Sequence, residues 1–420
     1  MSFFFTLLDD SLRPRGSRDP LGVELLWSRV GRRLVGNLTT VTAHLDNFIL
    51  TLVGFHLCVN EKSGQTDWQS FERFEQLTAR ARVARGLSGV IGVRRIRQSE
   101  GFPVPLGSGR KARILDDQRQ AGLWGLYSSA LEESRLTDKM RRPTQQGSGI
   151  ARQFLAAAPD EVWRLALDTQ IEHLGEEDMR RAADWVGALL GDPASRETLA
   201  NCLLSGGEKP QPWQGEVFSQ GRDFMAGKSA PPPARDFLRW LTEHSDTLRD
   251  YAARVLQFDE ALVLASLCFD WLLGCHGRTA DQINEGMAGL ASWPFHSPVM
   301  PDFGAEIDDG EWRRRSAGLA AFCSAMAAGQ WCQATEHLFA YHAAIAKARG
   351  GSPWCYWEAG KIKVVMSTTP GTLPVPADIS GDAFAGWMGR RSNSFFLDSF
   401  LAILHQTQPP APRSASHEPG

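Results

Sequence analysis

Apolar residues recur at helical spacing along most of this 420-residue chain. Near the N-terminus, Val23, Leu26 and Val30 are spaced to share one helix face, and residues 259–277 and 311–351 carry longer runs of the same kind. Short apolar stretches rich in β-branched residues are few, and we expect strands only around VIGVRRI and KIKVVMST. The sequence therefore predicts a mainly α, multi-helical fold with a few short strands.

Segments rich in glycine and proline divide the chain. Two such segments lie near the middle of the chain, LSGGEKPQPWQGE and GKSAPPPARD. The sequence before the first and after the second has helical periodicity. A chain of this length is also long enough for more than one core. We therefore expect an extended arm over 1–18, a helical domain over 19–204, a flexible linker over 205–234, a helical bundle with a short C-terminal strand over 235–405, and a disordered tail over 406–420.

Cysteine usage and the N-terminus predict a cytoplasmic protein. Seven cysteines, an odd number, are scattered without the spacing of a disulfide framework. The N-terminal MSFFFTLLDD lacks a basic region before its apolar residues and so does not resemble a signal peptide. The longest apolar run, residues 47–59, is too short to span a bilayer, and we expect no membrane association.

Charge is unevenly distributed although the net charge is only −3. From Arg73 to Arg142 there are fifteen Arg or Lys and seven Asp or Glu, a balance of +8, so the remainder carries −11. Such asymmetry indicates either a basic face for an anionic partner or a segment that docks on acidic groups of the same protein. The candidate DNA-binding residues are Arg94, Arg95, Arg97, Arg110, Lys111, Arg113, Lys139, Arg141 and Arg142.

The stretch LTDKMRRPTQQGSGIARQFL suggests a winged helix over about 108–156. In such a module a recognition helix enters the major groove and a cationic hairpin lies along the neighbouring phosphates. GLWGLYSSALEESRL is the candidate recognition helix, and Lys139, Arg141 and Arg142 are candidate wing cations. Thr144 and Gly147, followed by Ala151 one place late, resemble the T-x-x-G-x-x-A phrase that follows the wing in many bacterial winged-helix proteins.

Three phrases together resemble a poorly characterised group of bacterial proteins. They are DPLGVELLWSRVGRRLVGNLTTVTAHLDNF, the tryptophan- and tyrosine-bearing helix with its T-x-x-G turn, and RRSNSFFLDSFLAIL, and they cover about a third of the chain. Members of this winged-helix-like group are found in restriction and phage-defence gene clusters. The resemblance implies a defence accessory protein, often encoded beside an ATPase or a nuclease, and it supplies no catalytic residues.

No catalytic or metal-binding pattern stands out. Cysteines and histidines lie close together in the sequence only within segments predicted to be helical. Their spacings differ from the ligand spacings of structural zinc sites. Glu358 and Lys361 approximate the Glu-x-Lys of restriction-type nucleases, but their spacing is one residue too long. The chain has no G-x-x-x-x-G-K-[ST] phosphate-binding loop and no G-x-S-x-G nucleophile elbow. We therefore expect no cofactor and favour a role without enzymatic activity.

These observations favour a non-enzymatic component of a bacterial anti-phage defence or DNA-processing complex that binds duplex DNA through the winged-helix-like basic region. One alternative is a scaffold or adaptor that binds a partner ATPase or nuclease without touching DNA. Another is a divergent metal-dependent nuclease. Salt-sensitive DNA binding, partner capture without DNA, and metal-dependent nicking would distinguish the three hypotheses.

Overall fold

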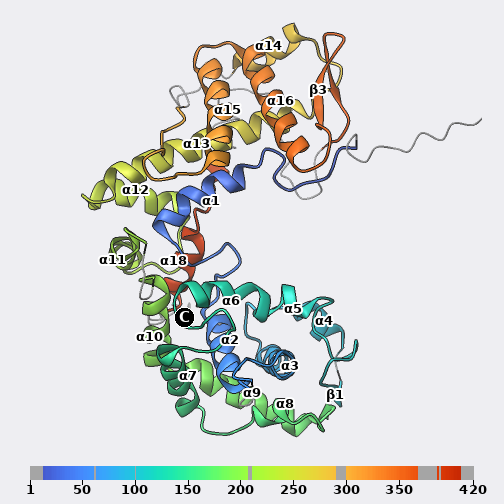
Figure 1. Ribbon diagram of the computed structural model, residues 1–420, viewed down its shortest axis with the longest axis vertical. Helices are drawn as coiled ribbons and strands as arrows, with labels where there is room; N and C mark the ends of the chain where they lie inside the picture. The colour runs from blue at the N-terminus through green and yellow to red at the C-terminus, as the bar shows by residue number, and fades with distance from the viewer. Residues whose placement is uncertain are drawn as a thin grey trace, which may run out of the picture. The chain divides into compact units, whose positions relative to one another are not determined.

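A computed structural model describes residues 13–60, 63–99, 101–206, 211–289, 299–367, 386 and 389–407. The chain is mainly helical and carries two small two-stranded antiparallel sheets, which confirms the predicted fold class (Figure 1). None of the described helices is both long enough and apolar enough to cross a bilayer.

The chain forms two compact units, and each is discontinuous in sequence. Unit 1 comprises residues 1–31 and 234–395, and unit 2 comprises residues 32–233 and 396–420. The division falls within helix α1 (Val23–Leu34) and again between Phe395 and Phe396. It therefore differs at both chain ends from the sequence-based division into 19–204 and 235–405.

Unit 1 is a helical bundle with one hairpin. Its further elements are α12 (Ala234–His244), α13 (Arg249–Leu272), α14 (Ala280–Ala288), α15 (Gly310–Ala327), α16 (Trp331–Ala348), β3 (Cys355–Glu358) and β4 (Lys361–Val364). Helix α15 packs on α16 and on the long, largely buried α13. The expected C-terminal strand is β4, which pairs with β3. Asp19 caps α1, because its carboxylate accepts the N–H groups of Val23 and Glu24.

Unit 2 is built around two buried helices, α2 and α3. Its elements are α2 (Leu45–Leu57), α3 (Trp68–Ala84), α4 (Val93–Gln98), β1 (Val104–Pro105), α5 (Gln118–Ala121), α6 (Leu123–Glu133), α7 (Gln145–Ala157), α8 (Arg164–Leu167), β2 (His173–Leu174), α9 (Glu176–Gly191), α10 (Pro193–Leu204), α11 (Gln214–Met225) and α18 (Leu397–His405). Every residue of α2 from Asn47 to Phe55 is buried, as expected for a central helix. An aromatic cluster that includes Phe55, Phe71 and Trp124 joins α2, α3 and α6.

Three local expectations differ from the structure. Residues 93–98, part of the predicted strand VIGVRRI, form helix α4, because Gly92 takes a left-handed φ of 78° and Ile96 then packs beside Ile114. Helix α11 lies within the predicted flexible linker, and its glycine- and proline-rich flanks mark its ends. Helix α2 begins at Leu45 without a side-chain cap, although the sequence places two candidate caps, Thr39 and Thr40, a few residues before it.

The two termini fall largely outside the described residues. Of the expected arm, residues 13–18 are described, and Pro14 forms a parallel bridge with Ser352 in unit 1. Of the expected tail, Gln406 and Thr407 are described, and the Gln406 side chain bonds to the backbone of Ala43 and Leu45 in unit 2.

Candidate nucleic-acid interface

Residues 106–113, which we call the basic loop, are held to helix α3 by buried side chains. Gln76 of α3 donates to the carbonyl of Gly107 (2.8 Å) and accepts the Gly107 N–H (2.9 Å). One helical turn further on, Arg80 donates to the carbonyl of Ala112 (2.8 Å). Because both ends of the loop are bonded to one buried helix, this stretch is fixed in place, although its glycines and serine by themselves favour a flexible loop.

Arg73, one turn before Gln76, ties the start of the loop to a second segment. Its guanidinium donates to the carbonyls of Leu106 (3.3 Å), Ala166 (2.7 Å) and Asp168 (2.6 Å). Burial lowers the pKa of Arg73 and lowers that of Arg80 to about 10, so both remain cations at neutral pH. Both guanidinium groups donate to backbone carbonyls, so these arginines support the loop from inside the unit.

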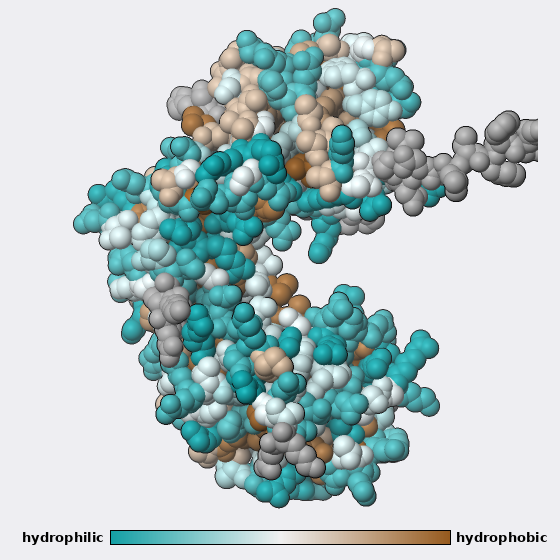
Figure 2. Space-filling model, viewed as in Figure 1, coloured by the Kyte–Doolittle hydropathy of each residue, from teal (hydrophilic) through white to brown (hydrophobic). Residues whose placement is uncertain are grey.

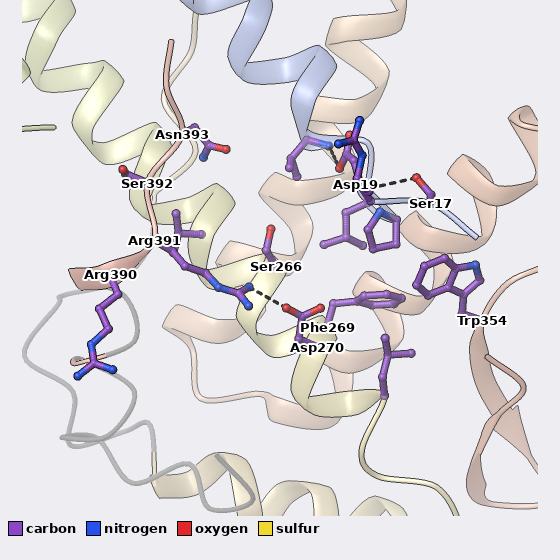
Figure 3. A pocket seen from close by; sticks show the side chains of 16 residues that line it. Ser17, Asp19, Ser266, Phe269, Asp270, Trp354, Arg390, Arg391, Ser392 and Asn393 are labelled. Carbon is purple, nitrogen blue, oxygen red and sulfur yellow. Dashed lines mark hydrogen bonds and ion pairs between the residues drawn. The ribbon is translucent and has the colours of Figure 1, made fainter. Parts of the chain in front are cut away.

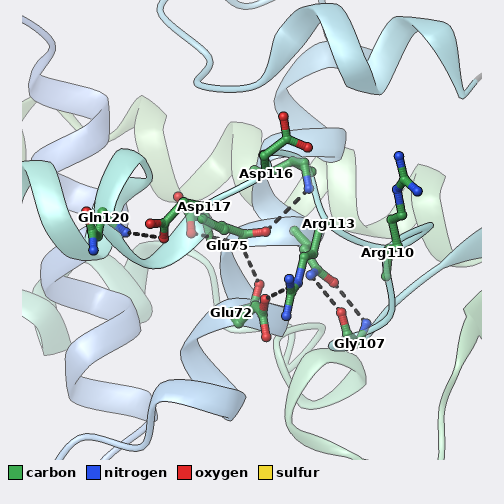
Figure 4. Close-up of polar contacts among 12 residues, drawn as sticks. Glu72, Glu75, Gly107, Arg110, Arg113, Asp116, Asp117 and Gln120 are labelled. Atoms are coloured by element: carbon green, nitrogen blue, oxygen red, sulfur yellow. Dashed lines mark hydrogen bonds and ion pairs between the residues drawn. The ribbon is translucent and has the colours of Figure 1, made fainter. Parts of the chain in front are cut away.

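Acidic side chains lie beneath the loop (Figure 4). Glu75 is buried, accepts the backbone N–H of Leu123 at the start of α6 (2.6 Å) and accepts a hydrogen bond from Gln118 (2.9 Å). Burial raises the pKa of Glu75 to about 7. Glu72 forms an ion pair with Arg113 (3.4 Å), so the last cation of the loop is paired although its side chain remains 44% exposed.

Four of the sequence-predicted cations remain exposed on one stretch of surface. Arg110 and Lys111 lie at the tip of the basic loop, and Arg94 and Arg97 lie on α4. Their side chains form no hydrogen bond or ion pair with the described part of the chain. Arg95 brings the two elements together, since it pairs with Asp116 (2.7 Å) and also donates to the Arg110 carbonyl (3.3 Å).

We call Arg94, Arg97, Arg110 and Lys111 the outer cations. In Figure 4 the Arg110 side chain points away from the acids that engage Arg113. In the view of Figure 2, the surface over α4, α5 and β1 is mainly hydrophilic. The outer cations therefore face solvent and are available to an anionic partner.

The remaining three candidates lie in the loop between α6 and α7, and two of them make contacts within unit 2. Arg141 stacks over Trp124, 4.6 Å from the ring centroid, and its Nε donates to Ser128 (3.0 Å). Arg142 pairs with Asp138 (2.7 Å), and Lys139 is exposed. Arg141 thus has a packing role within unit 2, and the candidate wing presents fewer unpaired cations than its sequence suggested.

The described residues contain the helices expected of the predicted winged helix but no two-stranded wing. Helices α6 and α7 form at the expected places, and Thr144 caps α7 by accepting the Gly147 N–H (3.1 Å). The fully described loop between them holds a single isolated bridge, Thr137 to Pro143, where a wing needs a two-stranded hairpin. Two further backbone bonds flank this bridge, from the Asp138 N–H to the Arg142 carbonyl (2.9 Å) and from the Thr144 N–H to the Leu136 carbonyl (3.0 Å). The loop therefore folds back on itself, but it forms no strand pair long enough to serve as a wing.

The residues considered for nuclease or metal chemistry make contacts with other parts of the folded chain. Glu358 and Lys361 face each other at the β3–β4 turn, and the Glu358 carboxylate pairs with Lys363 (2.8 Å). The described residues contain no group of three or more His, Cys, Asp or Glu placed to share a metal ion. Burial raises the pKa of the Cys275 thiol to about 11 and that of Cys355 to about 12, as expected of core cysteines.

Sequence reasoning found the exposed cations but missed the residues that support them. Arg73, Gln76 and Arg80 recur three and four residues apart, which places them on one face of α3. That polar spacing, beside an apolar stripe, was the available signal for a second buried face. Comparison of the chain with protein-family models, with characterised proteins and with solved structures gives no significant match.

Proposed function

We propose that this protein binds nucleic acid, with duplex DNA as the first partner to test, through the outer cations. The observation that carries the proposal is the fixed basic loop, whose backbone is bonded to buried side chains of α3 while Arg110 and Lys111 point to solvent. Residues 93–113 contain six Arg or Lys and one acid, Glu100. A phosphate backbone is the partner that such a surface attracts most strongly.

The fixed geometry matters as much as the charge. A flexible basic loop loses conformational entropy when it is ordered on a phosphate backbone, whereas a loop already held by Gln76 and Arg80 loses less. Phosphate contacts by Arg and Lys carry no sequence information. We therefore expect binding with little sequence preference and with a steep dependence on salt.

In the cell, we propose that this binding serves a bacterial anti-phage defence or DNA-processing complex in which a partner ATPase or nuclease performs the chemistry. The resemblance of the N-terminal phrase to proteins of defence gene clusters supports this proposal. A protein that binds DNA without sequence preference would supply the complex with substrate affinity.

The first prediction concerns the outer cations. Replacing Arg110→Glu together with Lys111→Glu should weaken binding to a short mixed-sequence duplex by about tenfold or more at low salt. The slope of log K against log salt should fall by about two, one for each lost phosphate contact. Fluorescence anisotropy between about 50 mM and about 200 mM salt measures both quantities.

Two matched variants make the test specific. Lys139→Glu with Arg142→Glu applies the same charge change to the candidate wing, and Arg164→Glu with Arg181→Glu applies it elsewhere on unit 2. We expect both to bind nearly as the wild type does. If the wing variant alone lost binding, the winged-helix interpretation would replace the basic loop. If the wild type bound no duplex even at low salt, the adaptor hypothesis would become the better one.

A further inference from the structure

Unit 1 contains a cavity of about 390 Å³, and none of the outer cations lines it. One wall is helix α13, where Val263, Ser266 and Asp270 recur three and four residues apart and are followed by the C-cap residue Leu273. Figure 3 shows Ser266 and Asp270 on this wall. The other walls come from residues 17–23 and 390–393. This volume lies within the usual range for organic ligands, about 300 to 1,000 Å³, and far exceeds the ~30 Å³ share of one water.

Part of the cavity lining is apolar and aromatic. Leu21, Phe269 and Trp354 all line it and are almost fully buried, and the two rings lie 6.5 Å apart between centroids. Because these side chains keep almost no exposed surface and the two ring planes are tilted by 44°, they close the cavity on this side and form no stacking slot.

A donor and an acceptor lie side by side on the opposite part of the lining. Arg391 extends from the segment 390–393 to Asp270 on α13, and a single bond joins its Nη1 to Oδ2 (2.7 Å), as Figure 3 shows. Among the described residues, nothing else bonds to this pair of side chains. The second carboxylate oxygen of Asp270 accepts no hydrogen bond from these residues, and the other guanidinium N–H groups of Arg391 donate none to them. Burial raises the pKa of Asp270 even though Arg391 is adjacent, as expected of an incompletely solvated carboxylate.

Ser266, one turn before Asp270, adds a third polar group. Its hydroxyl donates to the Leu262 carbonyl (2.8 Å) and therefore keeps its acceptor capacity. The cavity thus offers a ligand two acceptors on α13 and a charged donor on Arg391.

The charges around the cavity favour an anion. Arg18, Arg390 and Arg391 line it, against Asp19 and Asp270. Asp19 is already satisfied by the N–H groups at the start of α1. Arg18 and Arg390 are exposed, and although Arg390 is turned away from Asp270 in Figure 3, an exposed side chain can rotate toward a bound anion.

We propose that this cavity binds a purine nucleotide. Purines carry a hydrogen-bond donor beside an acceptor on one edge, which matches Asp270 beside Arg391, and the cavity volume of about 390 Å³ admits their bicyclic ring. The phosphate is directed to Arg18 and Arg390. This inference rests on unit 1 alone and is independent of DNA binding by the outer cations.

The test is isothermal titration of the full-length protein with AMP and GMP. Adenosine, guanosine, inorganic phosphate, CMP and glutamine are titrated in parallel. We expect one of the two purine nucleotides to bind at one site per chain, more tightly than its nucleoside. Phosphate and glutamine should bind at least about tenfold more weakly, because neither carries a base. CMP presents the same donor beside an acceptor on a smaller ring, so equally tight binding of CMP would overturn the assignment to purines.

Two variants remove the site in different ways. Asp270→Asn removes the charged acceptor, and Ser266→Leu fills the cavity while leaving the Asp270–Arg391 pair intact. Each should weaken nucleotide binding about tenfold or more. The matched controls are Asp246→Asn, an exposed acid outside the cavity, and Arg110→Glu with Lys111→Glu, and both should bind normally.

Several results would overturn the assignment. They are the absence of purine nucleotide binding, binding unchanged in a folded Ser266→Leu protein, or binding lost only with Arg110→Glu and Lys111→Glu. Preferential binding of glutamine would indicate that the Asp270–Arg391 pair recognises an amino acid. Melting curves establish whether each variant is folded.

Discussion

His342 shows how a single buried side chain couples stability to pH. Its Nε2 accepts the Trp354 N–H (2.9 Å), so the ring proton must be on Nδ1, which donates to the Pro20 carbonyl (3.0 Å). A second proton would have to displace the Trp354 N–H. Burial, helped by the charge of Arg349, lowers the pKa of His342 from 6.5 to about 4.

The pH dependence follows from that shift. Above pH 6.5 the imidazole is neutral in both folded and unfolded chains, and its contribution to stability is complete. Between pH 6.5 and about 4 only the unfolded chain binds the proton, so the free energy of unfolding of unit 1 should fall by about 1.4 kcal/mol per pH unit. Urea unfolding at several pH values between these limits measures this slope.

The variant His342→Gln isolates the contribution of this residue from that of the carboxylates, which also titrate. Glutamine does not bind a proton in this range, so the variant should be less stable at neutral pH but less sensitive to acid. Parallel stability curves for the wild type and the variant would show that His342 does not cause the slope.

At the scale of elements, α3 is the helix on which the basic loop depends. Gln76→Leu keeps a similar volume but removes both bonds to Gly107. Because it removes the partners of both backbone groups of the half-buried Gly107, it should destabilise unit 2 by about 1–3 kcal/mol. Hydrogen exchange at the Gly107 amide should become faster, and DNA affinity should fall severalfold although no exposed charge has changed.

Gln120→Leu is the matched control, since Gln120 is exposed on α5 and its side chain makes no contact with the basic loop. It should leave exchange at Gly107 and DNA affinity unchanged. Normal DNA affinity in a Gln76→Leu protein with a demonstrably loosened loop would mean that binding does not need the fixed geometry.

At the scale of the whole molecule, each unit is completed by a segment distant in sequence. Tyr251 of unit 1 donates to the Val30 carbonyl (2.9 Å), and α18 packs on α10 and α11 of unit 2. Fragment 32–233 should therefore unfold at lower temperature and less cooperatively than the same fragment joined to residues 396–407 through a flexible linker of about twenty residues. Circular dichroism melting of the two proteins measures the difference.

A scrambled version of residues 396–407 on the same linker controls for the added length and should not restore stability. Equal melting of all three proteins would show that 32–233 folds without α18. The sequence-based boundaries would then describe the folding unit better than the compact units do.

Much of the local structure could be predicted from the sequence. Helix periodicity and the caps at Asp67 and Thr144 act over only a few residues, so they can be read from the chain directly. Where the prediction failed, as at α4, a left-handed Gly92 and packing against Ile114 decided the outcome.

The sequence by itself determined the mainly helical class and the stretches where positive charge gathers, because both depend on neighbours within a few residues. Only the tertiary structure decided which cations are paired. Arg113 pairs with Glu72 and Arg141 stacks on Trp124, while the Arg110 side chain makes no hydrogen bond or ion pair with the described residues. Ion pairing and stacking depend on groups that approach only when the chain is folded, and the sequence does not state those distances.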